Sequence, residues 1–74
     1  MDHKSFYYTV SWDDASVYQR ALAAMQIPFT VESPGGRVPL GEGELSISFP
    51  DLPVRQYAAV RELFGEDGEK YPGT

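Results

Sequence analysis

The segment Phe6–Trp12 constrains the fold of this chain more than any other segment. In a β-strand every second side chain points to the same face. One face of this segment then carries four large apolar or aromatic side chains: Phe6, Tyr8, Val10 and Trp12. Such a strand needs paired neighbours and a cover on its apolar face. We therefore expect the rest of the chain to supply both.

A helix is expected directly after this strand. Asp13 and Asp14 offer carboxylates that can accept hydrogen bonds from the free N–H groups at a helix start. An apolar stripe follows at helical spacing: Val17, Ala21 and Met25, beside Tyr18 and Leu22. Pro28 disfavours helical geometry in the residue before it, so the helix should end near Met25 or Gln26. We expect the stripe to pack on the apolar face of Phe6–Trp12.

Two further strands and a second helix follow in the pattern. Residues 29–33 and 44–49 alternate, with Phe29, Val31, Leu45, Ile47 and Phe49 facing inward. Asp51 is the expected cap of the last helix and Pro53 lies in its first turn, while Gly65 suits a left-handed end. The buried stripe of that helix is Tyr57, Val60, Leu63 and Phe64. Residues 34–43 contain four glycines and two prolines, which predicts a long, partly mobile hairpin loop.

The predicted order is β-α-β-β-α, which indicates an α+β fold. We expect a truncated ferredoxin-like two-layer sandwich, with a three-stranded, mainly antiparallel sheet and two helices on one face. One domain should span residues 1–65, and residues 66–74 should form a flexible acidic tail. A strand order of 1-3-2 would leave the first strand on an edge, where it can pair with another chain. That route to a dimer requires the first strand to lie at the edge.

Length and composition exclude several ways of stabilising the fold. A chain of 74 residues is small, and small domains bury only about 60% of the surface that their unfolded chains expose. The chain has no cysteine and one histidine, His3, so disulfides, iron–sulfur clusters, cysteine zinc sites and histidine-rich sites are excluded. We expect no cofactor and no metal. A partner subunit is the remaining source of added stability.

Charge argues against nucleic acid and membranes as direct partners. The formal net charge is −5, and residues 41–74 hold seven acidic against three basic side chains, a net charge of −4. Binding to phosphates depends mostly on Lys and Arg, and the six present are scattered. The sequence contains no apolar run of signal-peptide or membrane-spanning length. These features predict a cytoplasmic protein.

The candidate sites each have a simpler interpretation. Arg37 in the glycine-rich loop could help cradle an anion, but the loop lacks phosphate-loop spacing, which favours an ordinary hairpin. Asp13 and Asp14 could act as acid and base or hold a metal with His3, but helix capping explains them better. The serines lack a Gly-x-Ser-x-Gly motif, so we do not expect an enzyme.

The predicted reverse face of the sheet and the acidic C-terminal part remain as interaction surfaces. The reverse face is rich in Ser and Thr and is expected mainly to contact water, with Tyr7 as its aromatic exception. The acidic residues could imitate nucleic-acid phosphates, or simply favour solubility. The candidate protein-contact residues are Tyr7, Thr9, Ser11, Arg37, Glu42, Glu44, Glu62, Glu66 and Asp67.

Three short motifs resemble a known family. Ile27-Pro28-Phe29 leads out of the first helix, Ile47-Ser48-Phe49-Pro50 leads into the last, and Leu63-Phe64-Gly65 ends it. This arrangement resembles small bacterial signal-transducing domains that are similar to half of a PII-like or ACT-like regulatory fold. Gln26 stands where that family usually has a glycine. The resemblance implies a non-catalytic, self-associating regulatory or binding domain, without an established ligand.

These observations lead to three hypotheses of different classes. The first is a small non-catalytic binding or regulatory module that acts through protein–protein contacts as a homodimer. The second is an acidic inhibitor from a phage or mobile element that blocks the basic groove of a host nucleic-acid enzyme or defence complex. The third is a small-molecule sensor that uses the loop around Arg37, which the sequence favours least.

Overall fold

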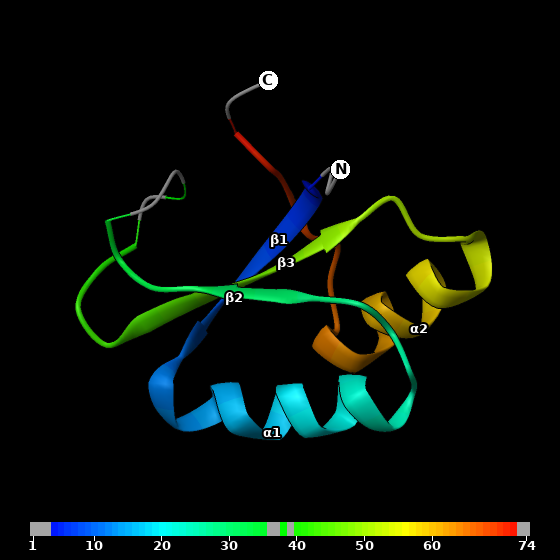
Figure 1. Cartoon of the computed structure of the whole chain (residues 1–74), viewed down its shortest axis with the longest axis horizontal. Coiled ribbons are helices and arrows are strands. Elements are labelled where there is room, and N and C mark those ends of the chain that lie inside the picture. The colour runs from blue at the N-terminus through cyan, green and yellow to red at the C-terminus, as the bar shows by residue number, and fades with distance from the viewer. Residues whose placement is uncertain (1–3, 36–37, 39, 73–74) are drawn as a thin grey trace.

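The computed structural model describes residues 4–35, 38 and 40–72. The elements are β1 (Lys4–Ser11), α1 (Trp12–Ala24), β2 (Thr30–Glu32), β3 (Glu44–Pro50), α2 (Val54–Phe64) and β4 (Glu69–Lys70). The strands form one antiparallel sheet in the order β2-β3-β1-β4, and both helices lie on the same face of it (Figure 1). The α+β class is confirmed. The expected three strands become four, because a short strand follows α2.

The ladder between β1 and β3 forms the centre of the sheet. It runs from Lys4 opposite Pro50 to Ser11 opposite Glu44. The helix-side face of the ladder is apolar and buried, as predicted from the alternation: Phe6, Tyr8 and Val10 come from β1, and Leu45, Ile47 and Phe49 from β3. Burial of large side chains at about 25 cal/mol per Å² makes this layer the main stabilising contribution to the fold.

Phe64 joins the two helices to the sheet. Its ring stacks on Tyr8 of β1, with centroids 4.0 Å apart, and on Tyr18 of α1, with centroids 4.3 Å apart. A second stacked pair, Phe6 and Phe49, lies 5.0 Å apart across the two central strands. Aromatic contacts therefore join strand to strand, strand to helix and helix to helix.

Trp12 does not belong to the core, contrary to the prediction. β1 ends at Ser11, whose Oγ accepts a hydrogen bond from the N–H of Asp14 at 3.2 Å and so caps α1. Trp12 is the first residue of the helix, and 60% of its surface is exposed. Because the backbone changes from strand to helix at Ser11, the period-2 alternation stops one residue before Trp12. Asp13 lies in the first helical turn instead of at the cap.

The buried side of α1 also differs from the predicted stripe. Ala15 and Leu22 are buried and Tyr18 is half-buried, whereas Val17 and Met25 are 64% and 39% exposed. The residues of α1 that pack on the core are Ala15, Tyr18 and Leu22, which are spaced by three and four residues along one helix face. Of the predicted stripe, Tyr18 and Leu22 belong to this face. The helix ends where Pro28 predicted, with Met25 as its C-cap.

Two boundaries of the remaining elements were predicted differently. β2 contains only Thr30–Glu32, so Phe29 packs on the core from the connection before the strand. Pro53 is the N-cap residue of α2, with no side-chain hydrogen bond, and Asp51 lies outside the helix. Gly65 ends α2 in a left-handed conformation with φ of 80°, as predicted.

Residues 66–72, which we call the C-terminal strap, were expected to be flexible but pack along β1. Lys70 and Glu69 lie opposite Phe6 and Tyr7, and the N–H of Tyr71 donates to the carbonyl of Ser5 at 3.1 Å. Tyr71 itself is buried. The expectation that the first strand is an edge strand is therefore wrong, because β1 lies between β3 and β4 and β4 pairs with it at Phe6 and Tyr7. Residues 73–74 lie outside the described part of the chain.

Replacing Val10 by Asp should unfold the domain, because the charge would enter the buried apolar face of β1. We expect a loss of about 4 kcal/mol or more, comparable with the stability of a small domain. Val17→Asp, the same change at an exposed valine of α1, should lose less than about 1 kcal/mol. Circular dichroism with urea unfolding compares the two variants. Similar losses in both would contradict this assignment of the core.

Gly68→Ala should loosen the C-terminal strap. A Cβ at Gly68 would lie 2.8 Å from Cδ2 of Phe6 and 3.1 Å from the carbonyl oxygen of Tyr7, which leaves no room for it. We expect a loss of about 1–3 kcal/mol in urea unfolding. Gly41→Ala is the control, since its Cβ would meet only the flexible side chain of Glu44, at 3.3 Å. Equal stability of the two variants would be inconsistent with close packing at Gly68.

Candidate functional site

The reverse face of the sheet, which points away from the helices, brings polar residues from three strands together. Tyr7 and Thr9 of β1 lie opposite Ser48 and Ser46 of β3. On the other side of β3, Thr30 and Glu32 of β2 lie opposite the same two serines. Ser46 and Ser48 therefore occupy the middle of this face, between polar residues on both sides.

Ser46 and Ser48 do not contact water, contrary to the prediction for this face. Their side chains are 0% and 1% exposed, and neither Oγ has a hydrogen-bond partner within the described residues. A buried hydroxyl without a partner costs about 1–3 kcal/mol relative to a satisfied one. The reverse face therefore has a cover of its own, and closing that cover over the serines has an energetic cost.

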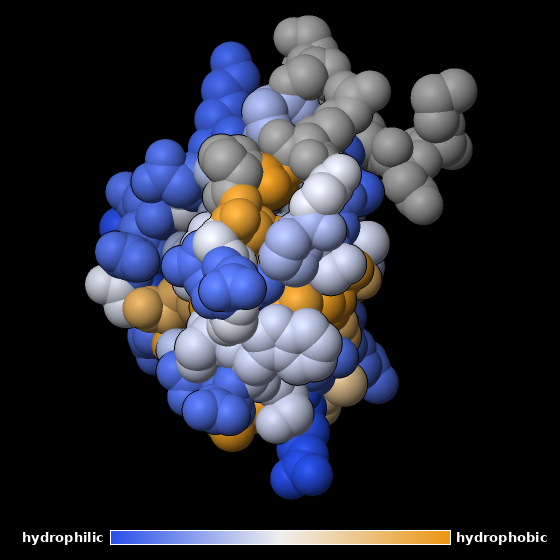
Figure 2. All heavy atoms as spheres, turned by 90° about the vertical axis from the view of Figure 1, so that its left-hand side faces the viewer, coloured by the Kyte–Doolittle hydropathy of each residue, from blue (hydrophilic) through white to orange (hydrophobic). Residues whose placement is uncertain are grey.

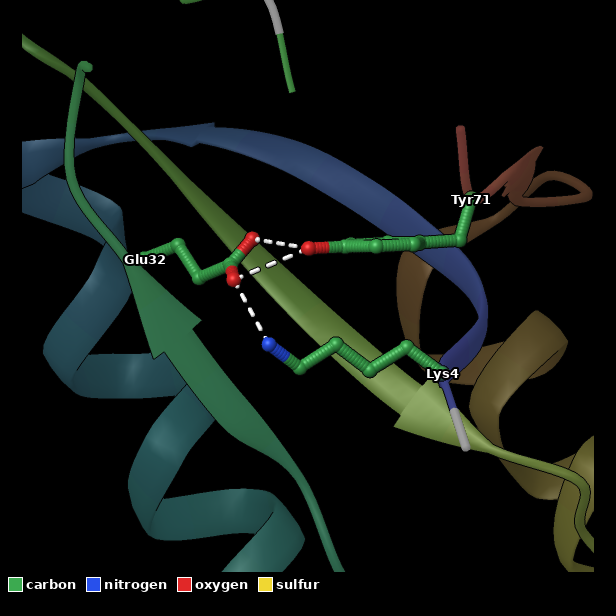
Figure 3. A network of polar contacts seen from close by, with 3 residues as sticks. All are labelled: Lys4, Glu32 and Tyr71. Carbon is green, nitrogen blue, oxygen red and sulfur yellow. Dashed lines mark hydrogen bonds and ion pairs between the residues drawn. The ribbon is translucent and has the colours of Figure 1, made fainter. Parts of the chain in front are cut away.

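A polar bridge of Lys4, Glu32 and Tyr71 forms part of this cover. Glu32 Oε2 accepts from Lys4 Nζ at 2.7 Å, and the Tyr71 hydroxyl lies 3.0 and 2.9 Å from the two carboxylate oxygens of Glu32. Figure 3 shows the three side chains meeting above β3, with Glu32 reaching from β2 and the other two from the opposite side. The bridge thus ties the outer strand β2 to β1 and to the C-terminal strap.

An irregularity at the start of β1 places Lys4 in the bridge. The register shifts between Lys4 and Phe6, so that Lys4 lies opposite Pro50 and Phe6 opposite Phe49. An extra residue in one strand reverses the face to which the preceding side chains point. Without the shift, Lys4 would share the apolar face of Phe6. The hydrogen bond to Glu32, supported by its negative charge, raises the pKa of Lys4.

Tyr8 anchors the other end of the C-terminal strap. Its hydroxyl donates to the backbone carbonyl of Glu66 at 2.8 Å, directly after α2. Burial, helped by the nearby charges of Asp67 and Glu66, raises the pKa of Tyr8 to about 12. The phenol therefore remains neutral and able to donate well above its ordinary titration range.

The acidic candidate residues fall into two separate groups. Glu42 and Glu44 lie at the start of β3, where Glu44 Oε1 accepts from the N–H of Gly41 at 2.6 Å. Glu62 lies in the last turn of α2, and Glu66 and Asp67 follow the end of that helix. The end of α2 and the start of β3 lie apart in the molecule (Figure 1).

The α2 group partly uses its charges within the chain. Asp67 forms an ion pair with Arg61. Glu62 and Glu66 line an open surface hollow with Ala58, Arg61 and Gly65. Two acidic groups, each with an internal contact, do not combine into one surface. Arg37 and His3, which we considered for an anion or metal site, lie outside the described residues.

Within residues 4–35, 38 and 40–72, no cluster of three His, Cys, Asp or Glu side chains could hold a metal ion. No helix in the same described ranges is long and apolar enough to cross a membrane. Comparison of the chain with family models, with curated proteins and with solved structures gave no match.

Sequence reasoning missed the bridge entirely. Its members are far apart in the chain, with Lys4 and Glu32 separated by 28 positions and Glu32 and Tyr71 by 39. Tyr71 was assigned to a tail, and Lys4 precedes the clear alternation of β1. The one available signal was a tyrosine within an otherwise polar C-terminal segment, since tyrosine combines an apolar ring with a hydrogen-bonding hydroxyl.

Tyr8→Phe should lower stability and flatten its dependence on alkaline pH. The phenol ionises near 10.0 when unfolded and near 12 when folded, so its contribution is complete below pH 10 and is lost as the pH rises toward 12. Near pH 8 the variant should lose about 1 kcal/mol, the value of one hydrogen bond. Between about pH 8 and pH 11, wild type should lose more stability than the variant in urea unfolding. Parallel pH profiles would refute this role of the hydroxyl.

Proposed function

We propose that this chain is a small non-catalytic binding module that acts through protein–protein contacts and associates as a homodimer. The observation that supports this most directly is the open part of the β1 edge beyond β4. β4 pairs with Phe6 and Tyr7 only, whereas β1 continues to Ser11. Because β4 covers Phe6 and Tyr7, a partner strand cannot pair along the whole of β1, as first expected. The second half of β1 is open to such a partner.

The direction of the backbone groups in β1 identifies the open positions. The N–H of Trp12 donates toward β3, to the carbonyl of Gly43 at 2.9 Å, while the carbonyl of Ser5 accepts from Tyr71 on the β4 side. Backbone groups alternate in direction along a strand. Thr9 therefore directs its N–H and C=O groups, and Ser11 its N–H group, away from β3 and beyond the reach of the two-residue β4. The carbonyl of Ser11 serves the first turn of α1, because Ser11 is the N-cap residue of that helix. Unpaired groups of this kind form a template for an incoming strand.

The chemistry of this edge favours a second copy of the chain as the partner. Thr9 and Ser11 are exposed and uncharged, so two chains of net charge −5 can pair here without placing like charges opposite each other. Antiparallel pairing of one edge with itself is the self-complementary contact that a two-fold dimer requires. Trp12, 60% exposed, follows directly and provides an aromatic anchor beside the edge.

The rest of the surface at this end is mixed in character. Figure 2 looks onto the end of the molecule where β1 passes into α1, and shows small apolar areas separated by hydrophilic residues. A contact led by backbone pairing with one aromatic anchor fits such a surface better than a broad apolar interface does. The layer arrangement is also compatible with the truncated ferredoxin-like plan and with the regulatory-domain resemblance, which supports the same class of function.

Sedimentation at micromolar concentration should give about twice the monomer mass, and Thr9→Pro should weaken the dimer about tenfold or more. Proline removes the outward N–H of Thr9 and leaves the ladder to β3 intact, because that N–H does not point toward β3. Thr9→Ala is the matched control, since it removes the side chain but retains the N–H. A monomeric wild type, or equal effects of both substitutions, would count against pairing through this edge.

The acidic inhibitor remains the second candidate. Glu42 and the two aspartates of the first turn of α1, Asp13 and Asp14, are exposed near the start of β3, which is the observation in its favour. Binding led by exposed charge weakens steeply with ionic strength, whereas pairing of an uncharged edge should hold. Self-association that persists at high salt supports the homodimer. Salt-sensitive capture of a basic partner by a monomeric chain would support the inhibitor instead.

A further inference from the structure

The C-terminal strap occupies the half of the β1 edge that the proposed dimer leaves unused. The N–H of Tyr71 donates a hydrogen bond to the outward carbonyl of Ser5, and Glu69 lies opposite Tyr7. By the alternation along β1, Ser5, Tyr7 and Thr9 direct their backbone groups, and Ser11 its N–H, to this same side. The strap therefore limits how much of one continuous edge a partner strand can reach.

The strap is attached at few points. Its strand, β4, has two residues, both exposed. Tyr8 holds its beginning through the carbonyl of Glu66, and Tyr71 holds its end through Glu32 and an edge-to-face contact with Tyr7, with centroids 6.3 Å apart. Gly65, with φ of 80°, directly precedes the first attachment, and Gly68 lies between the two. Release of the Tyr71 end would free the outward groups of Ser5 and Tyr7 and leave the Tyr8 attachment in place.

We infer that the C-terminal strap is an autoinhibitory strand, and that its displacement lengthens the β1 edge on which a second copy of the chain pairs. The inference rests on the proposed homodimer. In the closed state a partner reaches Thr9 and Ser11. In the open state it also reaches Ser5 and Tyr7, so pairing extends over the length of β1. The apparent affinity of the extended pairing is thus the intrinsic affinity multiplied by the fraction of chains in which the strap is open.

Tyr71→Phe tests the attachment with the smallest change. Phenylalanine retains the ring against Tyr7 but cannot donate to Glu32. If each of two chains must open, loss of this bond in both should tighten the dimer about tenfold or more. Lys70→Ala is the control, because this exposed β4 residue keeps its backbone pairing with Phe6 and should leave the dimer unchanged. An unchanged or weaker dimer with Tyr71→Phe would overturn the inference.

A reversible lock tests displacement directly. Tyr7→Cys combined with Glu69→Cys places two cysteines opposite each other in a chain that has no other cysteine. Opposite residues in an antiparallel pair have Cα atoms about 5.5 Å apart, within disulfide range. Sedimentation should show a dissociation constant about tenfold or more higher for the oxidised form than for the same protein after reduction. The reduced form is its own matched control.

The outcomes separate the two proposals. Equal dimerisation of the oxidised and reduced forms would overturn the autoinhibitory strap and leave the homodimer standing. A wild type that is monomeric, with Tyr71→Phe dimeric, would support the strap as an inhibitor and overturn the pairing of closed chains through Thr9 and Ser11. Monomers in every variant, including the reduced form, would overturn the homodimer and with it the role of the strap.

Discussion

Pairing between β1 and β3 is the interaction on which the rest of the structure depends. Its register decides which side chains enter the core and which line the reverse face, because a shift of one residue would exchange the two sets. With this register, Phe6 and Phe49 stack beneath the sheet while Tyr7 and Ser48 lie together above it. Every other element then packs on a surface that the ladder has already defined.

The C-terminal strap shows how so short a chain obtains additional burial. A domain of this size has little interior, and it gains by folding its own end against an exposed strand. Tyr8 contributes on both sides of this arrangement: its ring stacks on Phe64 in the core, and its hydroxyl fixes the carbonyl of Glu66. The core and the strap therefore share one side chain. Loss of packing in the core should therefore weaken the attachment of the strap, and loss of that attachment should weaken the packing of Tyr8 in the core.

The local pattern of apolar residues, proline and glycine predicted those parts of the fold that depend on neighbouring residues in the sequence. The alternation in β1 and β3 predicted both strands and their buried faces, and the proline and glycine signals predicted where both helices end. The alternation could not predict Ser46 and Ser48 as buried, because it distinguishes the two faces of a strand but does not show that the polar face is covered. β4 was missed because two residues carry no period.

The candidate site was predictable from the sequence to the same extent as the fold. Tyr7, Thr9 and Ser11 were placed correctly on one face of the first strand, since their positions follow from its alternation. The closure of half the edge follows from contacts between distant parts of the chain, which a single sequence does not contain. The acidic residues were grouped by composition, and composition does not determine position in space. The start of α1 was misassigned because Ser11 can end a strand as well as cap a helix.

The exposed position of Trp12 determines what optical spectroscopy can detect in this protein. It is the chain's single tryptophan and lies at the junction of β1 and α1, outside the aromatic core. Its indole is largely hydrated in the folded chain, so its emission should already resemble that of tryptophan in water. The five tyrosines, including the buried Tyr8, are better reporters of core packing. Tryptophan emission instead reports on the surface at one end of β1, and it should change little when the chain unfolds.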